Sequence, residues 1–197
     1  NPKIIFDIGG NIGIKSIYLA KLFPDSLIYS FEPMPENFEI LQKNISQYKN
    51  IRAFNYGLGS KNGSFKVYLS SDPENYGGIS FYPDAHGNQE KSYISCEVKN
   101  VNEIINDLEV ESIDLIKIDT EGAEYDILST LKVDILRGTS WITGELHGNR
   151  DFELLDYLDS IGFSISFKKQ ICNRFFMFNA GRFEILSQLN KKEIKIL

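Results

Sequence analysis

The stretch that decides the fold is Ile4-Ile5-Phe6-Asp7-Ile8-Gly9-Gly10-Asn11-Ile12-Gly13, close to the start of the chain. Its apolar half is typical of a buried strand, and the glycines after it allow a tight turn into the amphipathic segment 12–22. A parallel strand that enters a helix through a glycine-rich turn usually begins a nucleotide-binding α/β unit. We therefore predict that the chain opens with such a unit.

The residues around this turn indicate the kind of cofactor. The pattern is D-x-G-x-N-x-G, not the G-x-G-x-x-G fingerprint of dinucleotide-binding folds, and it is formed by Asp7, Gly9, Asn11 and Gly13. The carboxylate of Asp7 suits a ligand with a positive group, such as the sulfonium and α-amino groups of S-adenosylmethionine (SAM). Glu32 follows the predicted strand 27–31, about 20 residues beyond the turn, where a carboxylate can bond both ribose hydroxyls. The alternative is that the glycines only form a tight strand-to-helix turn.

The length and composition of the chain limit its class. The chain has 197 residues, of which 42% are hydrophobic, so we expect one globular domain over 1–197. Because the chain begins with Asn1, we also expect it to be a segment of a longer natural chain. The net charge of −6 argues against a nucleic acid as partner, and the absence of an apolar run of about 18 residues argues against a membrane span. Cys96 and Cys172 lack the spacing of a metal site, so we expect two reduced thiols in a cytoplasmic protein.

The rest of the sequence repeats the alternation of strand and helix. Strands are predicted at 3–7, 27–31, 51–54, 113–118 and 141–146, and helices at 12–22, 35–48, 101–108, 122–131 and 151–161. The segments 163–167 and 175–178 read as an antiparallel pair that ends the fold. This order predicts an α/β fold with a mostly parallel sheet and helices on both faces.

The middle of the chain is less regular. Strands are predicted at 64–69 and 93–98. Gly57 lies in a loop after strand 51–54 that could close over an adenine, and the alternative is a simple turn into the next strand. The long polar stretch 70–92 is predicted to be a lid or acceptor loop, against the alternative of a solvated insertion.

Several chemically active residues follow the predicted parallel strands. Right-handed crossovers place the carboxyl ends of all parallel strands on one rim of the sheet. The residues expected together on that rim are Asp7, Glu32, Gly57, Asp119, Glu121, Glu145 and His147. Their convergence is the strongest sequence argument for a functional site.

At these residues the sequence resembles the FkbM family of SAM-dependent methyltransferases. The resemblance covers roughly residues 4–180 and rests on the blocks 6–13, 31–37, 58–59, 117–124 and 145–147. It implies a class I methyltransferase (Rossmann-like) fold with a seven-stranded sheet, one terminal strand of which is antiparallel. It also implies methyl transfer to a hydroxyl of a small-molecule or glycan acceptor, such as a sugar or a secondary metabolite.

The resemblance also implies roles for individual residues. Those that would hold the methionine part of SAM are Asp7, Gly9, Asn11 and Gly13, and Glu32 would hold the ribose. Pro33, Gly57 and Asp119 complete the predicted cofactor set. Gly10 stands where the family more often has alanine, which we expect to leave the site undisturbed.

The acceptor hydroxyl must lose a proton during methyl transfer, so a base is expected. His147 is the first candidate because its unperturbed pKa lies near neutral pH, and Asp119 is the second. A structural, hydrogen-bonded role for His147 is the alternative. Lys117, inside a buried strand, is expected to reach a carboxylate rather than to do chemistry.

Two further alternatives stay open. One, which is not favoured, is a divalent metal such as Mg²⁺, which would be held by Asp119, Glu121, Glu145 and His147. If no metal binds, we expect Glu121 to cap its own helix and Glu145 to bond a backbone group. The other functional classes are a non-catalytic SAM-binding module and, less favoured, a nicotinamide-dependent oxidoreductase on the same topology.

Overall fold

We describe the protein from a computed structural model, which places residues 1–69, 79–80, 93–147, 149–172 and 175–182. The predicted acceptor loop 70–92 therefore lies almost wholly outside the described residues.

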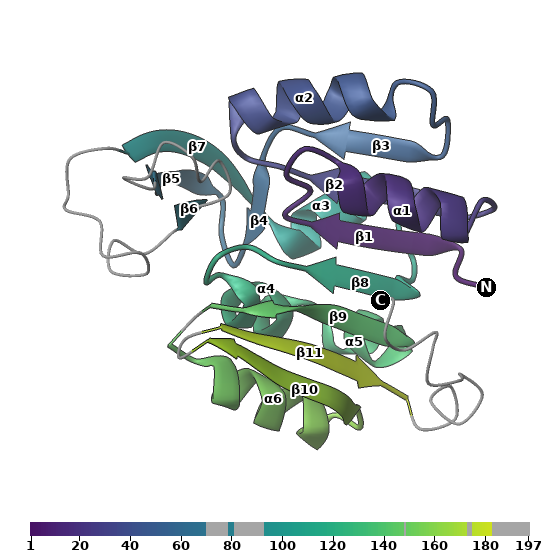
Figure 1. Ribbon diagram of the computed structural model, residues 1–197. Helices are drawn as coiled ribbons and strands as arrows, with labels where there is room; N and C mark the ends of the chain where they lie inside the picture. The colour runs from purple at the N-terminus through teal and green to yellow at the C-terminus, as the bar shows by residue number, and fades with distance from the viewer. Residues whose placement is uncertain (70–78, 81–92, 148, 173–174, 183–197) are drawn as a thin grey trace.

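The main sheet has seven strands in the order β10-β11-β9-β8-β1-β2-β3 (Figure 1). Five strands pair in parallel with one another, and β11 is antiparallel to both of its neighbours, so β10 runs in the same direction as those five. The bounds are β1 Ile4–Ile8, β2 Leu27–Phe31, β3 Ile51–Phe54, β8 Leu115–Ile118, β9 Trp141–Leu146, β10 Ser164–Cys172 and β11 Phe175–Gly181. The predicted seven-stranded sheet with one antiparallel strand is confirmed.

Helices cover both faces of this sheet because alternate strand residues point to opposite sides. Ile5 and Ile28 pack in a cluster with α1 (Ile14–Leu22) and α2 (Pro35–Ile45). Phe6 and Phe31 belong to a larger cluster on the other face. The helices that contribute to that larger cluster are α3 (Val101–Asp107), α4 (Glu124–Thr130), α5 (Val133–Gly138) and α6 (Asp151–Ser160). Among the described residues, no helix is long and apolar enough to cross a bilayer.

Local backbone geometry explains where the helices differ from the sequence prediction. Gly13 has a left-handed φ of 87°, so α1 begins after it and not at Ile12. Glu121 and Gly122 also have positive φ, of 58° and 121°, which delays the start of α4. Leu131 is extended, with ψ 135°, so the predicted helix 122–131 ends there and a separate α5 follows, which the sequence did not predict.

A second, four-stranded sheet was also not predicted. Its order is β4-β7-β5-β6, with bounds β4 Gly57–Gly59, β7 Tyr93–Asn100, β5 Gly63–Leu69 and β6 Ile79–Ser80. Figure 1 shows it beside the end of the main sheet toward which the parallel strands point. Gly57 begins a strand of this sheet, as the turn-into-strand alternative expected, and its contact with an adenine stays a prediction.

Candidate active site

The glycine-rich turn joins β1 to α1 at the carboxyl end of the parallel strands. The amides of Gly9 and Gly10 both donate to the carbonyl oxygen of Phe31, at 3.0 and 2.9 Å. Gly9 has φ 83°, and a Cβ there would lie 1.9 Å from the backbone oxygen of Asp119. Gly9 is therefore required because the turn packs directly against the end of β8, a reason that the sequence argument about ligand approach did not contain.

Glu32 closes this turn from the end of β2. It is 2% exposed; its Oε2 accepts the amide of Asn11 at 2.8 Å and its Oε1 accepts the amide of Met34 at 2.9 Å. Burial raises the pKa of Glu32, and the two backbone donors offset part of that effect. A carboxylate can accept about four donors, and beside the two amides and the side chain of Asn37 it has room for a further one. The residue type and its placement therefore fit the hydroxyls of a ribose.

Pro33 and Gly57 lie beside Glu32. A Cβ at Gly57 would meet the Cβ of Pro33 at 3.5 Å, so the start of β4 packs against the residue after Glu32. The structure thus brings together three members of the predicted cofactor set, Glu32 and Pro33 directly after β2 and Gly57 at the start of β4.

Asp7 faces a positive group of the protein itself. Its side chain is fully buried, Oδ2 accepts a hydrogen bond from the hydroxyl of Ser16 at 2.5 Å, and Oδ1 lies 3.2 Å from Nζ of Lys117. The argument that Asp7 selects a cationic ligand therefore needs correction, because Lys117 already supplies its counter-charge. The sequence contained a signal for this pair, since a lone lysine in the buried run Leu115–Ile118 needs a carboxylate on a neighbouring strand.

Lys117 connects the glycine turn to the end of β8. Its Nζ donates to the carbonyl of Gly9 at 2.7 Å and lies 4.0 Å from Oδ2 of Asp119. Burial alone would lower its pKa, but Asp7 and then Asp119 outweigh burial and raise it. The expectation that Lys117 reaches a carboxylate is confirmed, and its bond to the turn is an additional finding.

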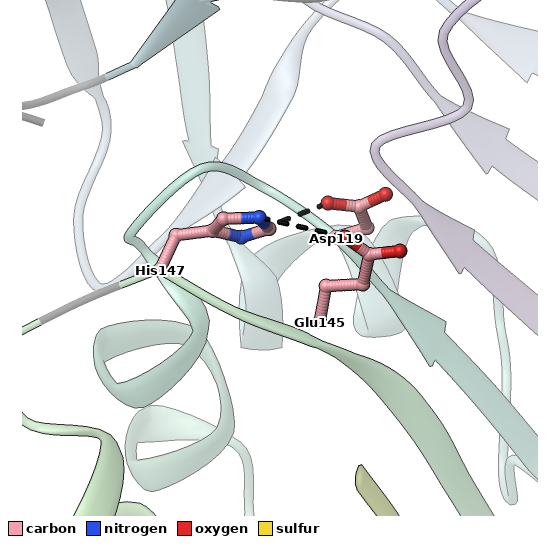
Figure 2. A group of neighbouring side chains, drawn as sticks. All are labelled: Asp119, Glu145 and His147. Atoms are coloured by element: carbon pink, nitrogen blue, oxygen red, sulfur yellow. Dashed lines mark ion pairs between the residues drawn. The ribbon is translucent and has the colours of Figure 1, made fainter. Parts of the chain in front are cut away.

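Four carboxylates surround His147, which directly follows β9. Its side chain is 4% exposed, and Figure 2 shows Asp119 and Glu145 directed toward the ring. Nδ1 lies 3.8 Å from Oδ1 of Asp119 and 3.6 Å from Oε1 of Glu124. Nε2 lies 3.8 Å from Oε2 of Glu121 and 3.6 Å from Oε2 of Glu145. The structure thus brings together the four predicted rim residues that follow or end β8 and β9. We call these four residues and Glu124 the acidic cluster: Asp119, Glu121, Glu124, Glu145 and His147.

This environment changes the chemistry of His147. Burial would lower its pKa, but the carboxylates of Glu124 and Glu145 outweigh burial and raise the pKa to about 10. Burial also raises the pKa of Asp119, and it raises that of Glu121 to about 7. The raised pKa of His147 lies well above the unperturbed value that suggested this residue as the general base, so that assignment loses its support from the pKa and stays a prediction.

Glu124 is the member of the acidic cluster that sequence reasoning did not single out. It is 1% exposed, and its Oε1 accepts hydrogen bonds from the amide and hydroxyl of Thr120, at 2.9 and 3.0 Å, and from the amide of Gly122, at 3.2 Å. Glu124, not Glu121, therefore accepts the amides before α4. The one sequence signal was its place at the end of the block 117–124.

Comparisons with known proteins agree with this geometry. A family model described as the methyltransferase FkbM domain matches residues 7–165. Methyltransferase 1 of Beauveria bassiana is 30% identical over 149 residues, which are 66% of this chain and 59% of that protein, so the chain spans about three fifths of this relative. The 2-O-methyltransferase NoeI of Sinorhizobium fredii is 26% identical over 189 residues, 85% of this chain and 76% of that one.

A solved structure shows the same fold. M. capricolum TrmK, in complex with S-adenosylhomocysteine, superposes with a TM-score of 0.56 at 13% identity, over 92% of this chain and 62% of its own. The match confirms the class I methyltransferase fold.

Proposed function

This chain belongs to the FkbM family of methyltransferases, and on this premise we propose that it transfers a methyl group from SAM to a hydroxyl of a sugar, glycan or secondary-metabolite acceptor. The observation that carries the proposal is the family match over 7–165, because that range contains both the glycine turn and the acidic cluster. The name of the relative NoeI, a 2-O-methyltransferase, supports oxygen as the atom that is methylated.

We propose that SAM lies along the glycine turn. Glu32 would accept the ribose hydroxyls, Pro33 and Gly57 would flank the adenosine, and the turn residues Gly9, Asn11 and Gly13 would contact the methionine part. Asp7 would act through Lys117 by holding the turn in place. When bound, SAM supplies an electrophilic methyl group on a sulfonium, so that positioning of the acceptor accounts for much of the rate.

The acceptor hydroxyl would bind at the acidic cluster. Asp119 is 33% exposed and links the two parts of the site, because its backbone oxygen touches Gly9 and its Oδ1 faces His147. A hydroxyl placed beside Asp119 would therefore be next to the cofactor turn. Asp119 and His147 stay the residues that we propose to act on this hydroxyl. Asp119 is the favoured base, because the pKa of His147 is raised to about 10.

Calorimetric titration with SAM, S-adenosylhomocysteine and NADH is the first test. We expect the first two to bind and NADH not to bind, which would remove the oxidoreductase alternative. The Glu32→Ala variant should weaken SAM binding, whereas Glu36→Ala, an exposed carboxylate in the first turn of α2, should not. Binding of NADH but not of SAM would overturn the proposal.

Turnover is the second test. The release of S-adenosylhomocysteine would be measured with a panel of glycans, hydroxylated metabolites and RNA. We expect turnover with an acceptor of the first two kinds; the exclusion of nucleic acid, which rests on the net charge of −6, stays a prediction that the RNA arm checks. A protein that binds SAM but turns over with no acceptor would favour the non-catalytic alternative.

A further inference from the structure

The atoms of the acidic cluster are spaced like metal ligands. Asp119, Glu145 and His147 each offer one donor atom, and these three atoms all lie within 4.8 Å of one another (Figure 2). The separation of 3.6 Å between Nε2 of His147 and Oε2 of Glu145 exceeds that of a good hydrogen bond, about 2.7–3.2 Å. Donors that share a cation at about 2.1 Å lie roughly 3.0–3.4 Å apart. The Nε2–Oε2 separation is a few tenths of an ångström from that arrangement, and the 4.8 Å bound on the three atoms means that no pair has to close by more than about 1.8 Å.

The charge of the cluster calls for a cation. Four carboxylates face one imidazole, and their side chains are 33%, 21%, 1% and 38% exposed in the order Asp119, Glu121, Glu124 and Glu145. Lys117 is a further positive group, 4.0 Å from Asp119, but it lies closer to Asp7, at 3.2 Å. Carboxylates this close together repel one another, and a bound cation would relieve that repulsion.

The second observation is the orientation of His147. A histidine that binds a metal through one ring nitrogen usually donates the other N–H to a carboxylate, which sets the direction of the ring. Glu124 faces Nδ1 at 3.6 Å, and three hydrogen bonds from Thr120 and Gly122 hold it there. Nε2 is turned toward Glu145, at 3.6 Å, and Asp119 lies 3.8 Å from Nδ1 of the same ring, so its carboxylate has to move toward Nε2 to share a cation there. Glu124 is thus placed as the carboxylate that orients a ligand.

We propose that Asp119, Glu145 and Nε2 of His147 bind one divalent cation of the Mn²⁺ or Mg²⁺ class, with Glu124 as the positioning residue for His147. An imidazole beside carboxylates favours Mn²⁺ over Mg²⁺.

The function of the cation rests on the proposed methyl transfer. A hydroxyl bound to the cation loses its proton to solvent more readily, and its oxygen then forms the bond to the methyl carbon as the bond from sulfur breaks. S-adenosylhomocysteine and the methyl ether are the products, so no further reactant is needed. Acceptors with two neighbouring hydroxyls would suit such a site best, because both oxygens can bind one ion.

The test is titration of the metal-free chain with Mn²⁺ at pH 7.5, followed by electron paramagnetic resonance. We expect one ion per chain, displaced by excess Mg²⁺. Glu145→Gln, at the most exposed ligand, should abolish this binding, and Glu124→Gln should weaken it about 10- to 100-fold. Glu111→Gln, at an exposed carboxylate outside the cluster, is the matched control and should bind like the unaltered protein.

Thermal unfolding of each variant shows whether it is folded. The inference is overturned if no ion binds saturably up to about 1 mM, or if Glu145→Gln and Glu111→Gln bind Mn²⁺ equally. SAM binding, measured separately by calorimetry, keeps the two proposals apart: SAM binding without Mn²⁺ binding refutes this inference alone, and Mn²⁺ binding without SAM binding refutes the proposed function alone.

Discussion

Replacement of Lys117 by methionine tests how the site is held together. Methionine keeps most of the length and apolar character of the side chain but removes the ammonium group. Asp7 then keeps the hydroxyl of Ser16 as a partner but loses its counter-charge, and the carbonyl of Gly9 loses its 2.7 Å donor. Breaking one half of a buried ion pair costs about 3–5 kcal/mol, because the other charge is left uncompensated.

This loss can be measured by urea unfolding and by thermal unfolding, both followed by circular dichroism. For a chain of this size, 1 kcal/mol corresponds to roughly 2–4 °C, so we expect Tm to fall by about 6–20 °C. SAM affinity should fall as well, since the turn loses its tether to β8. The Lys99→Met variant is the control, because its ion pair with Glu97 is exposed and should contribute no more than about 1 kcal/mol.

A double variant sharpens the argument. Asp7→Asn together with Lys117→Met removes both charges, so the uncompensated carboxylate disappears and most of the lost stability should return. If Lys117→Met stays within about 1 kcal/mol of the unaltered protein, or if the double variant is no more stable than the single one, the buried pair does not hold the turn as reasoned.

Three other predictions follow from single residues. Glu32→Ala should weaken SAM binding by roughly 1.5–3 kcal/mol, about 10- to 150-fold in Kd, because charge-assisted bonds to the ribose are lost; unchanged affinity by calorimetry would remove Glu32 from the ribose. Gly9→Ala should unfold at a much lower temperature than Gly10→Ala. The first variant adds a Cβ 1.9 Å from a backbone oxygen at φ 83°, whereas the Cβ of the second meets the hydroxyl of Ser30, at 2.2 Å, and Cδ1 of Leu41, at 3.0 Å, which are side-chain atoms that can shift. Equal melting temperatures would contradict this reasoning. Burial raises the pKa of Cys96 to about 11, so at pH 8 only about one thiol in a thousand is a thiolate. Iodoacetamide should therefore label the peptide that contains Cys96 only after unfolding in urea or at much higher pH, which mass spectrometry would show.

The strand-to-helix pattern was predictable because it depends on neighbours in the sequence. Apolar runs of four to six residues marked the parallel strands, and Pro35 marked the first turn of α2 as expected. The second sheet was not predictable in the same way. Alternation indicated the strands at 64–69 and 93–98, but alternation shows only that a strand has one buried face and not which strand pairs with it.

The sequence by itself determined the α/β class of the main sheet, the rim where the candidate residues gather and the position of Glu32, because each follows from the alternation of strand and helix and from residue types at strand ends. Only the tertiary structure decided what those residues do. It paired Asp7 with Lys117 across β1 and β8, and it placed Glu124 against the ring of His147. The physical reason is that protonation and ligand geometry depend on burial and on charges a few ångströms away, and segments distant in the sequence supply those charges.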